Sequence, residues 1–221
     1  MPRPSQPLIT REAAIRTALE IIDKDGVAAF GVQRLAAEMG VKAPSLYHHF
    51  EGKEEILTQV ARMIIREVEP PPSPTASRWQ EWFVDIATRL RRVVLSHPKA
   101  APLLIEYFPR GYFLSTYERS ALFLQRVGVP VEFHALLLDG LDKLSFGAAI
   151  MDATALSNGD TGLFPGVDPN RDPALSAAIE ANPWTGEALF KESIRRFVQG
   201  VVDAPPPKPH KSKESRSRRS G

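Results

Sequence analysis

The side chains best suited to chemistry lie close together in a predicted helix at 43–50 and just after it. On this helix the apolar side chains share one face, while Ser45 and His48 point away from it. A helix so short, with polar and aromatic side chains on its outer face, is suited to insertion into a DNA groove. We expect Ser45 and His48 to contact base edges, and Tyr47 and Lys53 to contact phosphates.

Other readings of the same residues remain open. The helices could form a plain three-helix bundle, or a helical ligand-binding or adaptor module without specific DNA reading. Asp139 and Asp142 are spaced for acid–base work, but such pairs are usually exposed, and His97 stands at a predicted helix end. The sequence shows no Ser/His/Asp set, glycine-rich phosphate loop or pair of metal-binding histidines. We therefore expect no enzyme, no metal and no cofactor.

The composition is that of a globular protein with a substantial core. The chain has 221 residues, of which 43% are hydrophobic, and it contains no cysteine, which excludes disulfides and thiolate zinc sites. No apolar run is long enough to cross a membrane and no secretory signal is visible, so a cytoplasmic protein without a membrane partner is expected.

The net charge of +2 is unevenly distributed. The C-terminal tail contains six basic residues and a single acidic residue, Glu214, so its positive charge exceeds that of the whole chain and the rest of the chain is net negative. The basic residues of the tail are Lys208, Lys211, Lys213, Arg216, Arg218 and Arg219. We expect this tail to be disordered, and sequence-independent DNA binding through it is a further alternative.

Apolar residues at helical spacing, without any alternating strand pattern, predict an all-α fold. A three-helix helix-turn-helix DNA-binding domain is expected first, followed by a larger helical ligand-binding and dimerisation domain. The expected segments are a flexible arm at 1–9, the helix-turn-helix domain at 10–57, a connecting helix at 53–69, a Pro-rich linker at 70–77, the second domain at 78–203 and the basic tail at 204–221. Within the second domain, helices are expected at 78–96, 100–107, 111–127, 130–156 and 185–202.

The segment 10–57 resembles the N-terminal domain of the TetR family of bacterial transcriptional repressors. The residues that carry the resemblance are Gly26, Leu35, Ala36, Gly40, Val41, Pro44, Leu46, Tyr47, Phe50, Lys53 and Leu57. The resemblance implies base contacts from Gln33 in addition to Ser45 and His48, and phosphate contacts from the Tyr and Lys already named. One departure is Gly31, because the family usually has a hydroxyl at this point to cap the second helix and touch a phosphate.

Residues 79–151 resemble the drug-binding domain of the tetracycline repressors, a branch of that family. The resemblance assigns an apolar and aromatic ligand pocket to Ile86, Leu90, Leu104, Tyr107, Phe108, Tyr117, Ser120, Leu138, Phe146 and Met151. Leu104 and Met151 stand at positions that hold or support the drug's magnesium ion in that branch, and Glu69 and Ile86 replace two polar pocket residues. Since Leu and Met do not ligate magnesium, we expect an apolar or aromatic ligand and no magnesium–tetracycline complex.

A homodimer is expected from the residues of two predicted helices. Gly140 and Gly147 on the predicted helix 130–156 permit close helix approach, and Phe197 and Val201 on the last helix supply apolar area. Two DNA-reading heads related by twofold symmetry require a palindromic operator. The sequence thus predicts a repressor that binds double-stranded DNA as a homodimer and is released when a small-molecule effector moves the connecting helix.

Overall fold

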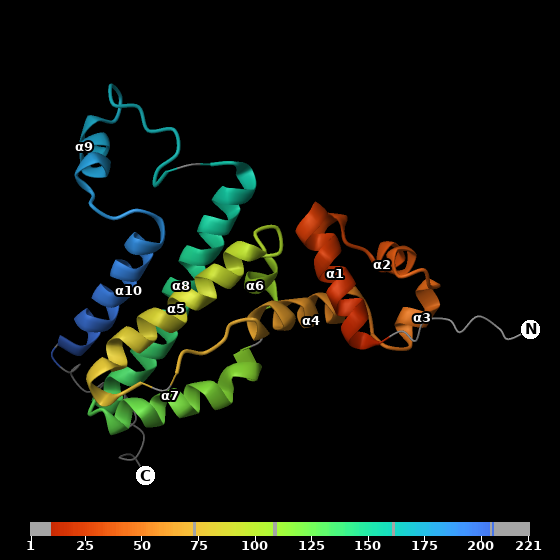
Figure 1. The fold of residues 1–221 in the computed structure, drawn as a ribbon, viewed down its shortest axis with the longest axis horizontal. Coiled ribbons are helices and arrows are strands. Elements are labelled where there is room, and N and C mark those ends of the chain that lie inside the picture. The colour runs from red at the N-terminus through yellow and green to blue at the C-terminus, as the bar shows by residue number, and fades with distance from the viewer. Residues whose placement is uncertain (1–9, 73, 108–109, 161, 204, 206–221) are drawn as a thin grey trace, which may run out of the picture.

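The computed structural model describes residues 10–72, 74–107, 110–160, 162–203 and 205 (Figure 1). Every regular element in this part of the chain is helical, which confirms the all-α prediction. The α-helices are α1 (Arg11–Asp25), α2 (Val32–Glu38), α3 (Ala43–Tyr47), α4 (Lys53–Arg66), α5 (Trp79–Ser96), α6 (Leu103–Glu106), α7 (Leu114–Arg126), α8 (His134–Asn158), α9 (Pro173–Ala181) and α10 (Gly186–Asp203). The predicted arm, Phe108 and the tail beyond Pro205 lie outside the described residues.

Helices α1, α2 and α3 form a small N-terminal head against the start of α4. The side chain of Thr10 accepts a hydrogen bond from the Ala13 N–H at 3.1 Å and so caps the N-terminus of α1. Gly40 adopts a φ of +66° after α2, and the Val41 N–H donates to the Ala36 carbonyl at 2.9 Å. This C-terminal cap, which favours glycine at its left-handed position, turns the chain sharply from α2 into α3.

The larger C-terminal body is built on α5, α8 and α10. These three helices pack against one another, and α7 lies along α8. Their apolar stripes meet in a core that contains Phe83, Val84, Ala87, Leu124, Val129, Phe133, Leu137, Leu141, Phe190, Ile194, Val198 and Val201. The described part of the chain has no helix long and apolar enough to span a bilayer.

A second core belongs to both halves of the molecule. It starts among α1 to α4 and continues without a break into Leu90 and Val94 of α5, Leu103 and Leu104 of α6, and Ile150 of α8. Helix α4 runs between the head and the body (Figure 1). The head is therefore packed on the body as well as connected to it.

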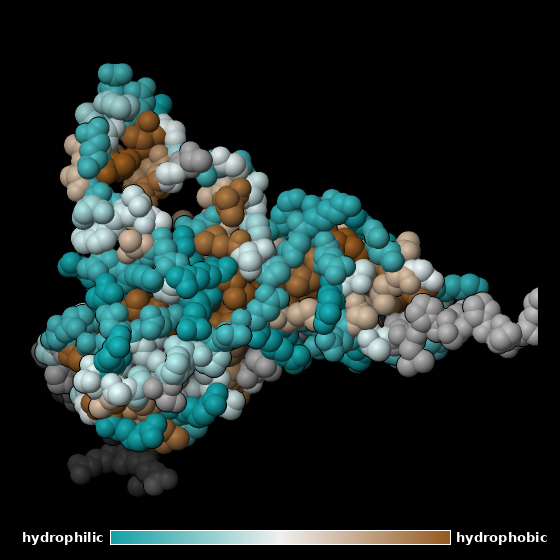
Figure 2. All heavy atoms as spheres, in the orientation of Figure 1, coloured by the Kyte–Doolittle hydropathy of each residue, from teal (hydrophilic) through white to brown (hydrophobic). Residues whose placement is uncertain are grey.

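Several helix ends differ from the predicted ones. Helix α3 ends at Tyr47 and not at residue 50, because the N–H groups of His49 and Phe50 both donate to the Leu46 carbonyl and close the turn. Helix α9 was not expected, and its segment stands away from α5 and α8 (Figure 1). Apolar side chains are exposed on that segment (Figure 2), including Leu163, Phe164, Leu175 and Trp184.

Candidate nucleic-acid interface and ligand cavity

The short helix α3 separates buried and exposed side chains within three residues. Leu46 is fully buried, whereas Tyr47 is 53% exposed and His48 is exposed just beyond the helix. Ser45 is half-buried at the edge of the core. The outward Tyr and His are therefore free of the packing that holds Leu46 in the core, as the helical wheel predicts. Contacts from these side chains to bases and phosphates stay predictions.

Gln33 precedes α3 in the sequence and Lys53 follows it, and both residues are exposed. Gln33 lies in the first turn of α2, and Lys53 is the first residue of α4. The Lys53 ammonium lies 5.9 Å from the centroid of the Phe30 ring. Helices α2 and α3 form the end of the molecule remote from α10 (Figure 1).

A polar clasp that was not predicted from the sequence ties the α3–α4 turn to α1. Arg11 donates to the His49 carbonyl and forms an ion pair with Glu55, and its guanidinium stacks 4.5 Å from the Phe50 ring centroid. The Glu51 N–H donates to Glu55 at 2.7 Å. Arg11 and this N–H lower the pKa of the Glu55 carboxyl. The clasp therefore holds the turn between α3 and α4 against α1.

A cavity of about 310 Å³ lies between α4, α5, α7 and α8. One wall is apolar and aromatic, and it is formed by Ile65 and Val68 together with Trp82, Phe83, Ile86, Ala87 and Leu90 of α5. The predicted pocket residues found in the walls are Ile86, Leu90, Tyr117, Ser120, Leu138 and Phe146. A cavity of this size, mostly apolar, is at the small end of sites that hold organic ligands.

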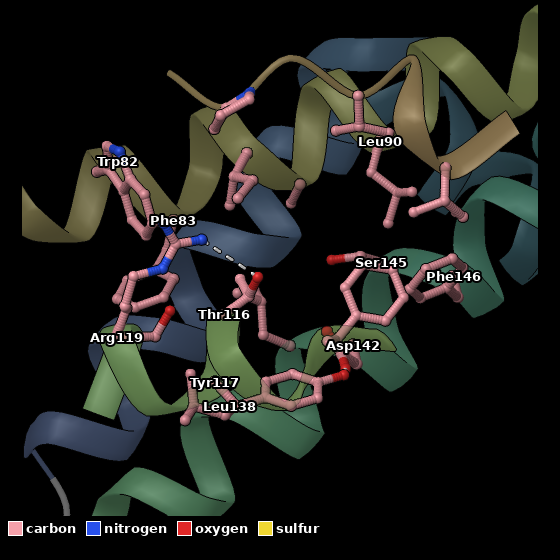
Figure 3. A pocket seen from close by; sticks show the side chains of 18 of the residues that line it. Trp82, Phe83, Leu90, Thr116, Tyr117, Arg119, Leu138, Asp142, Ser145 and Phe146 are labelled. Atoms are coloured by element: carbon pink, nitrogen blue, oxygen red, sulfur yellow. Dashed lines mark hydrogen bonds between the residues drawn. The ribbon is translucent and has the colours of Figure 1, made fainter. Parts of the chain in front are cut away.

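Polar groups gather on the opposite side of the cavity, on α7 and α8 (Figure 3). The Tyr117 hydroxyl donates to the Asp142 carboxylate. Arg119 donates to the Thr116 hydroxyl at 3.4 Å. Ser145, one turn beyond Asp142, has a buried hydroxyl without a hydrogen-bond partner. Thr116, Arg119, Asp142 and Ser145 were not predicted, because helical serines and charged residues in a sequence usually indicate a solvated face.

Three predicted pocket residues do not line this cavity. Leu104 is 2% exposed, but α6 places it in the core beneath α4. Tyr107 packs against the edge of the same core. Met151 is 73% exposed, because it lies on the side of α8 turned away from the body. Leu104, Tyr107 and Met151 therefore lie outside the wall of this cavity, and their assignment to a ligand pocket stays a prediction.

The magnesium site of the tetracycline repressors does not fit these residues. Leu104 offers no ligand atom and is enclosed by hydrocarbon, and Met151 points away from the cavity. Among the described residues, no three His, Cys, Asp or Glu side chains are grouped to hold a metal ion. Magnesium prefers oxygen ligands and retained waters, neither of which an apolar wall provides.

The predicted dimer residues divide into two groups. Gly147 is exposed and has open space around it. Gly140, in contrast, is covered by Phe197 of the same chain, since a Cβ at Gly140 would lie 2.4 Å from the Phe197 Cζ atom. Val201 is buried in the core of the body. The apolar area of Val201 is used within the chain, where α5 and α8 pack against α10, and its place in a dimer interface stays a prediction.

His97 links the head to the body. It follows α5, and its Nδ1 lies 2.7 Å from the Asp23 carboxylate of α1, while its Nε2 lies 3.1 Å from the Glu67 carboxylate just after α4. Burial lowers the pKa of His97, but the two carboxylates outweigh burial and raise it above its usual value. The imidazolium form therefore holds α1, α4 and α5 together.

Replacing His97 by asparagine should reduce the free energy of unfolding by about 1–3 kcal/mol at low pH. The folded-state pKa is raised, so the contribution of His97 is fully present below its unfolded pKa and is lost as pH rises through the folded value. Denaturant unfolding between about pH 5.5 and about pH 9 measures this gap. A gap that stays constant or widens with pH would contradict the charged junction. Lys99→Ala, which removes a donor to the Lys24 carbonyl in the same region, is the control.

Comparisons with known proteins agree with this architecture. Residues 14–60 match the bacterial regulatory proteins of the tetR family. The chain is 32% identical over 201 residues to the class C tetracycline repressor protein of Escherichia coli, covering 87% of this chain and 90% of that protein. An HTH-type transcriptional regulator of Saccharopolyspora erythraea is 33% identical over 99 residues, which are 45% of this chain and 42% of that protein. ActR of Streptomyces coelicolor in complex with actinorhodin has a TM-score of 0.69 and 25% identity, over 88% of this chain and 97% of that chain.

The similarity covers 87% of this chain in the class C repressor and 88% in ActR, so it extends well beyond the N-terminal head. Proteins of this kind are DNA-binding transcriptional regulators that respond to small ligands, and they are not enzymes. The class of function predicted from the sequence is thereby confirmed. The chain belongs to the TetR family of bacterial regulatory proteins.

Proposed function

We propose that this protein represses transcription by binding a palindromic operator as a homodimer, and that an apolar or aromatic small molecule releases it. One observation carries the proposal. Helix α4 begins with the exposed Lys53 beside α3, and its last turn places Ile65 and Arg66 in the cavity wall. A ligand in the cavity therefore touches the helix whose other end lies at the DNA-reading surface.

On the DNA side, α3 would enter the major groove. Ser45, His48 and Gln33 would contact base edges, and Tyr47 would donate to a phosphate. Lys53 would hold a second phosphate, supported by the free N–H groups in the first turn of α4. The exposure of Gln33, Tyr47, His48 and Lys53 supports these roles. We place this activity in the cytoplasm, where bacterial operator DNA is reached.

Selection of bound sites from random DNA tests the operator. A palindrome with half-sites about one helical turn apart, roughly 34–36 Å, is expected.

His48→Ala should cost about 1–3 kcal/mol of binding free energy on that palindrome and relax the preference at one base position. Lys53→Ala should weaken binding to all sequences alike and reduce the salt slope by about 1. Retention of full selectivity by His48→Ala, or a sequence-selective loss in Lys53→Ala, would show that these roles are misassigned.

On the ligand side, the aromatic and aliphatic wall of α5 supports an effector with a large apolar face. The complex of ActR with actinorhodin shows that a relative of this fold accommodates an organic molecule. In this chain the effector would press on Ile65 and Val68 at the end of α4. The junction at His97 couples the same region to α1. A preference of about 1–3 kcal/mol for the conformation that does not bind DNA would be enough for release.

A homodimer is supported by an apolar stripe on α8. At 100° per residue, Leu136, Leu144 and Met151 fall within about 80° of one another, with Gly140 and Gly147 between them. All three apolar side chains are exposed, Leu144 to 42%. Phe197, seated over Gly140, continues this surface onto α10. The stripe would pair with its own copy across a twofold axis.

A further inference from the structure

We propose that Ser145 is the hydrogen-bonding contact for the effector, and that the effector is a fused-ring aromatic compound with a hydroxyl group. This inference rests on the ligand cavity of the proposed function. Ser145 is 2% exposed, lies in the cavity wall, and its Oγ has no hydrogen-bond partner. In Figure 3 its hydroxyl points from α8 into the space between α5 and α7.

An unpartnered hydroxyl away from water is unfavourable in the free protein. A ligand oxygen that reaches Ser145 supplies the missing bond, whereas a purely apolar ligand leaves the hydroxyl unpaired. A buried polar group in a site discriminates strongly for this reason. Other helical hydroxyls, such as Thr88 and Thr154, donate to the carbonyl four residues earlier, but Ser145 does not. The cavity wall also contains the buried indole N–H of Trp82, which is likewise unpartnered.

The rest of the cavity indicates the ligand's body. Trp82 and Phe83 meet edge to face at 5.1 Å between ring centroids, and Ile86 and Leu90 extend the same wall along α5. Phe146 lies next to Ser145 on α8, across the cavity from this wall (Figure 3). A flat ring system between these walls would bury its faces against carbon while one edge meets Ser145. The cavity of about 310 Å³ is small for a drug-sized molecule, which favours two or three fused rings.

Isothermal titration calorimetry on the full chain with two shape-matched probes, β-naphthol and β-methylnaphthalene, tests the inference. Each probe is titrated into the wild type and into Ser145→Ala, so the difference in probe solvation cancels in the cycle. The relative affinity for β-naphthol should fall by about 2- to 10-fold in Ser145→Ala, with β-methylnaphthalene binding retained or improved. Ser176→Ala is the matched control, since Ser176 is also a buried, unpartnered serine but lies on α9 outside the cavity wall.

A second measurement separates ligand contact from a structural role. Removing an unpartnered hydroxyl should leave the Tm of the free protein unchanged or raise it, whereas loss of a hidden structural bond would lower it. If the two probes keep the same relative affinity in both variants, the role of Ser145 is overturned and the ligand cavity stands. If neither probe binds the wild type, the proposal of an aromatic effector is refuted as well. Operator binding, measured separately by fluorescence anisotropy, decides the DNA-binding half of the proposed function.

Discussion

Leu144→Glu should convert the proposed homodimer into monomers and reduce affinity for the proposed palindromic operator by about 10²- to 10⁴-fold. Leu144 lies in the middle of the exposed apolar stripe of α8, and a carboxylate there would be desolvated against the same residue of a second copy. A monomer keeps its intact head but holds a single half-site, so the gain from simultaneous binding of two heads disappears. Sedimentation velocity and anisotropy with the full palindrome measure the two effects.

Leu122→Glu is the control for this substitution. Leu122 is a similarly exposed leucine, but it lies on α7 outside the stripe. Its replacement should change neither the mass in solution nor operator affinity, since solvent already surrounds the side chain. A Leu144→Glu protein that stays dimeric would refute the α8 stripe as the dimer interface, and an equal loss in Leu122→Glu would point to a general effect of added charge.

The second large effect concerns two adjacent residues of α3. Leu46→Ala should reduce the free energy of unfolding by about 2–5 kcal/mol, because the side chain is fully buried and its loss leaves a cavity beneath the reading helix. Tyr47→Ala should change stability by less than about 0.5 kcal/mol, because the ring is largely exposed. For DNA affinity we expect the opposite order of the two variants. At a temperature where both are folded, Tyr47→Ala should bind all DNA sequences more weakly than Leu46→Ala does, because it lacks the proposed phosphate contact.

Thermal unfolding and operator binding, measured on the same preparations, separate the two roles. If Tyr47→Ala destabilises the fold as much as Leu46→Ala does, the tyrosine is a packing residue and its phosphate role is lost. If Leu46→Ala keeps the thermal stability of the wild type but loses selectivity for the operator, the wrong face of α3 has been assigned to the core. Either result would require a new alignment of α3 with the groove.

The helices could be predicted because their signals are local. Apolar spacing, the Thr10 cap and the Gly40 turn all act within a few residues, and the structure places helices where they indicate. Helix ends were less certain, since the end of α3 depends on which N–H groups share the Leu46 carbonyl. The exposed face of α3 followed from the same local pattern, which is why Tyr47 and His48 lie outward as expected.

The cavity was less predictable because its walls come from helices far apart in the chain. The resemblance placed Ile86, Leu90 and Phe146 at the cavity, but it carried Leu104 and Met151 to positions that this fold uses for the core and the outer surface. The partners of His97 could not be predicted, since Asp23 and Glu67 are 74 and 30 residues away. Ser145 became visible as a site residue through the absence of a partner for its hydroxyl.

The core that runs unbroken from α1 to α8 has a consequence for how such a regulator changes over generations. Leu103 and Ile150 belong to the body in sequence but to the head in packing, so side chains on both sides must remain complementary. A chimera that joins residues 10–57 of this chain to the body of a relative would combine two mismatched halves of one core. A substitution in either half of this core is therefore constrained by its fit to side chains in the other half.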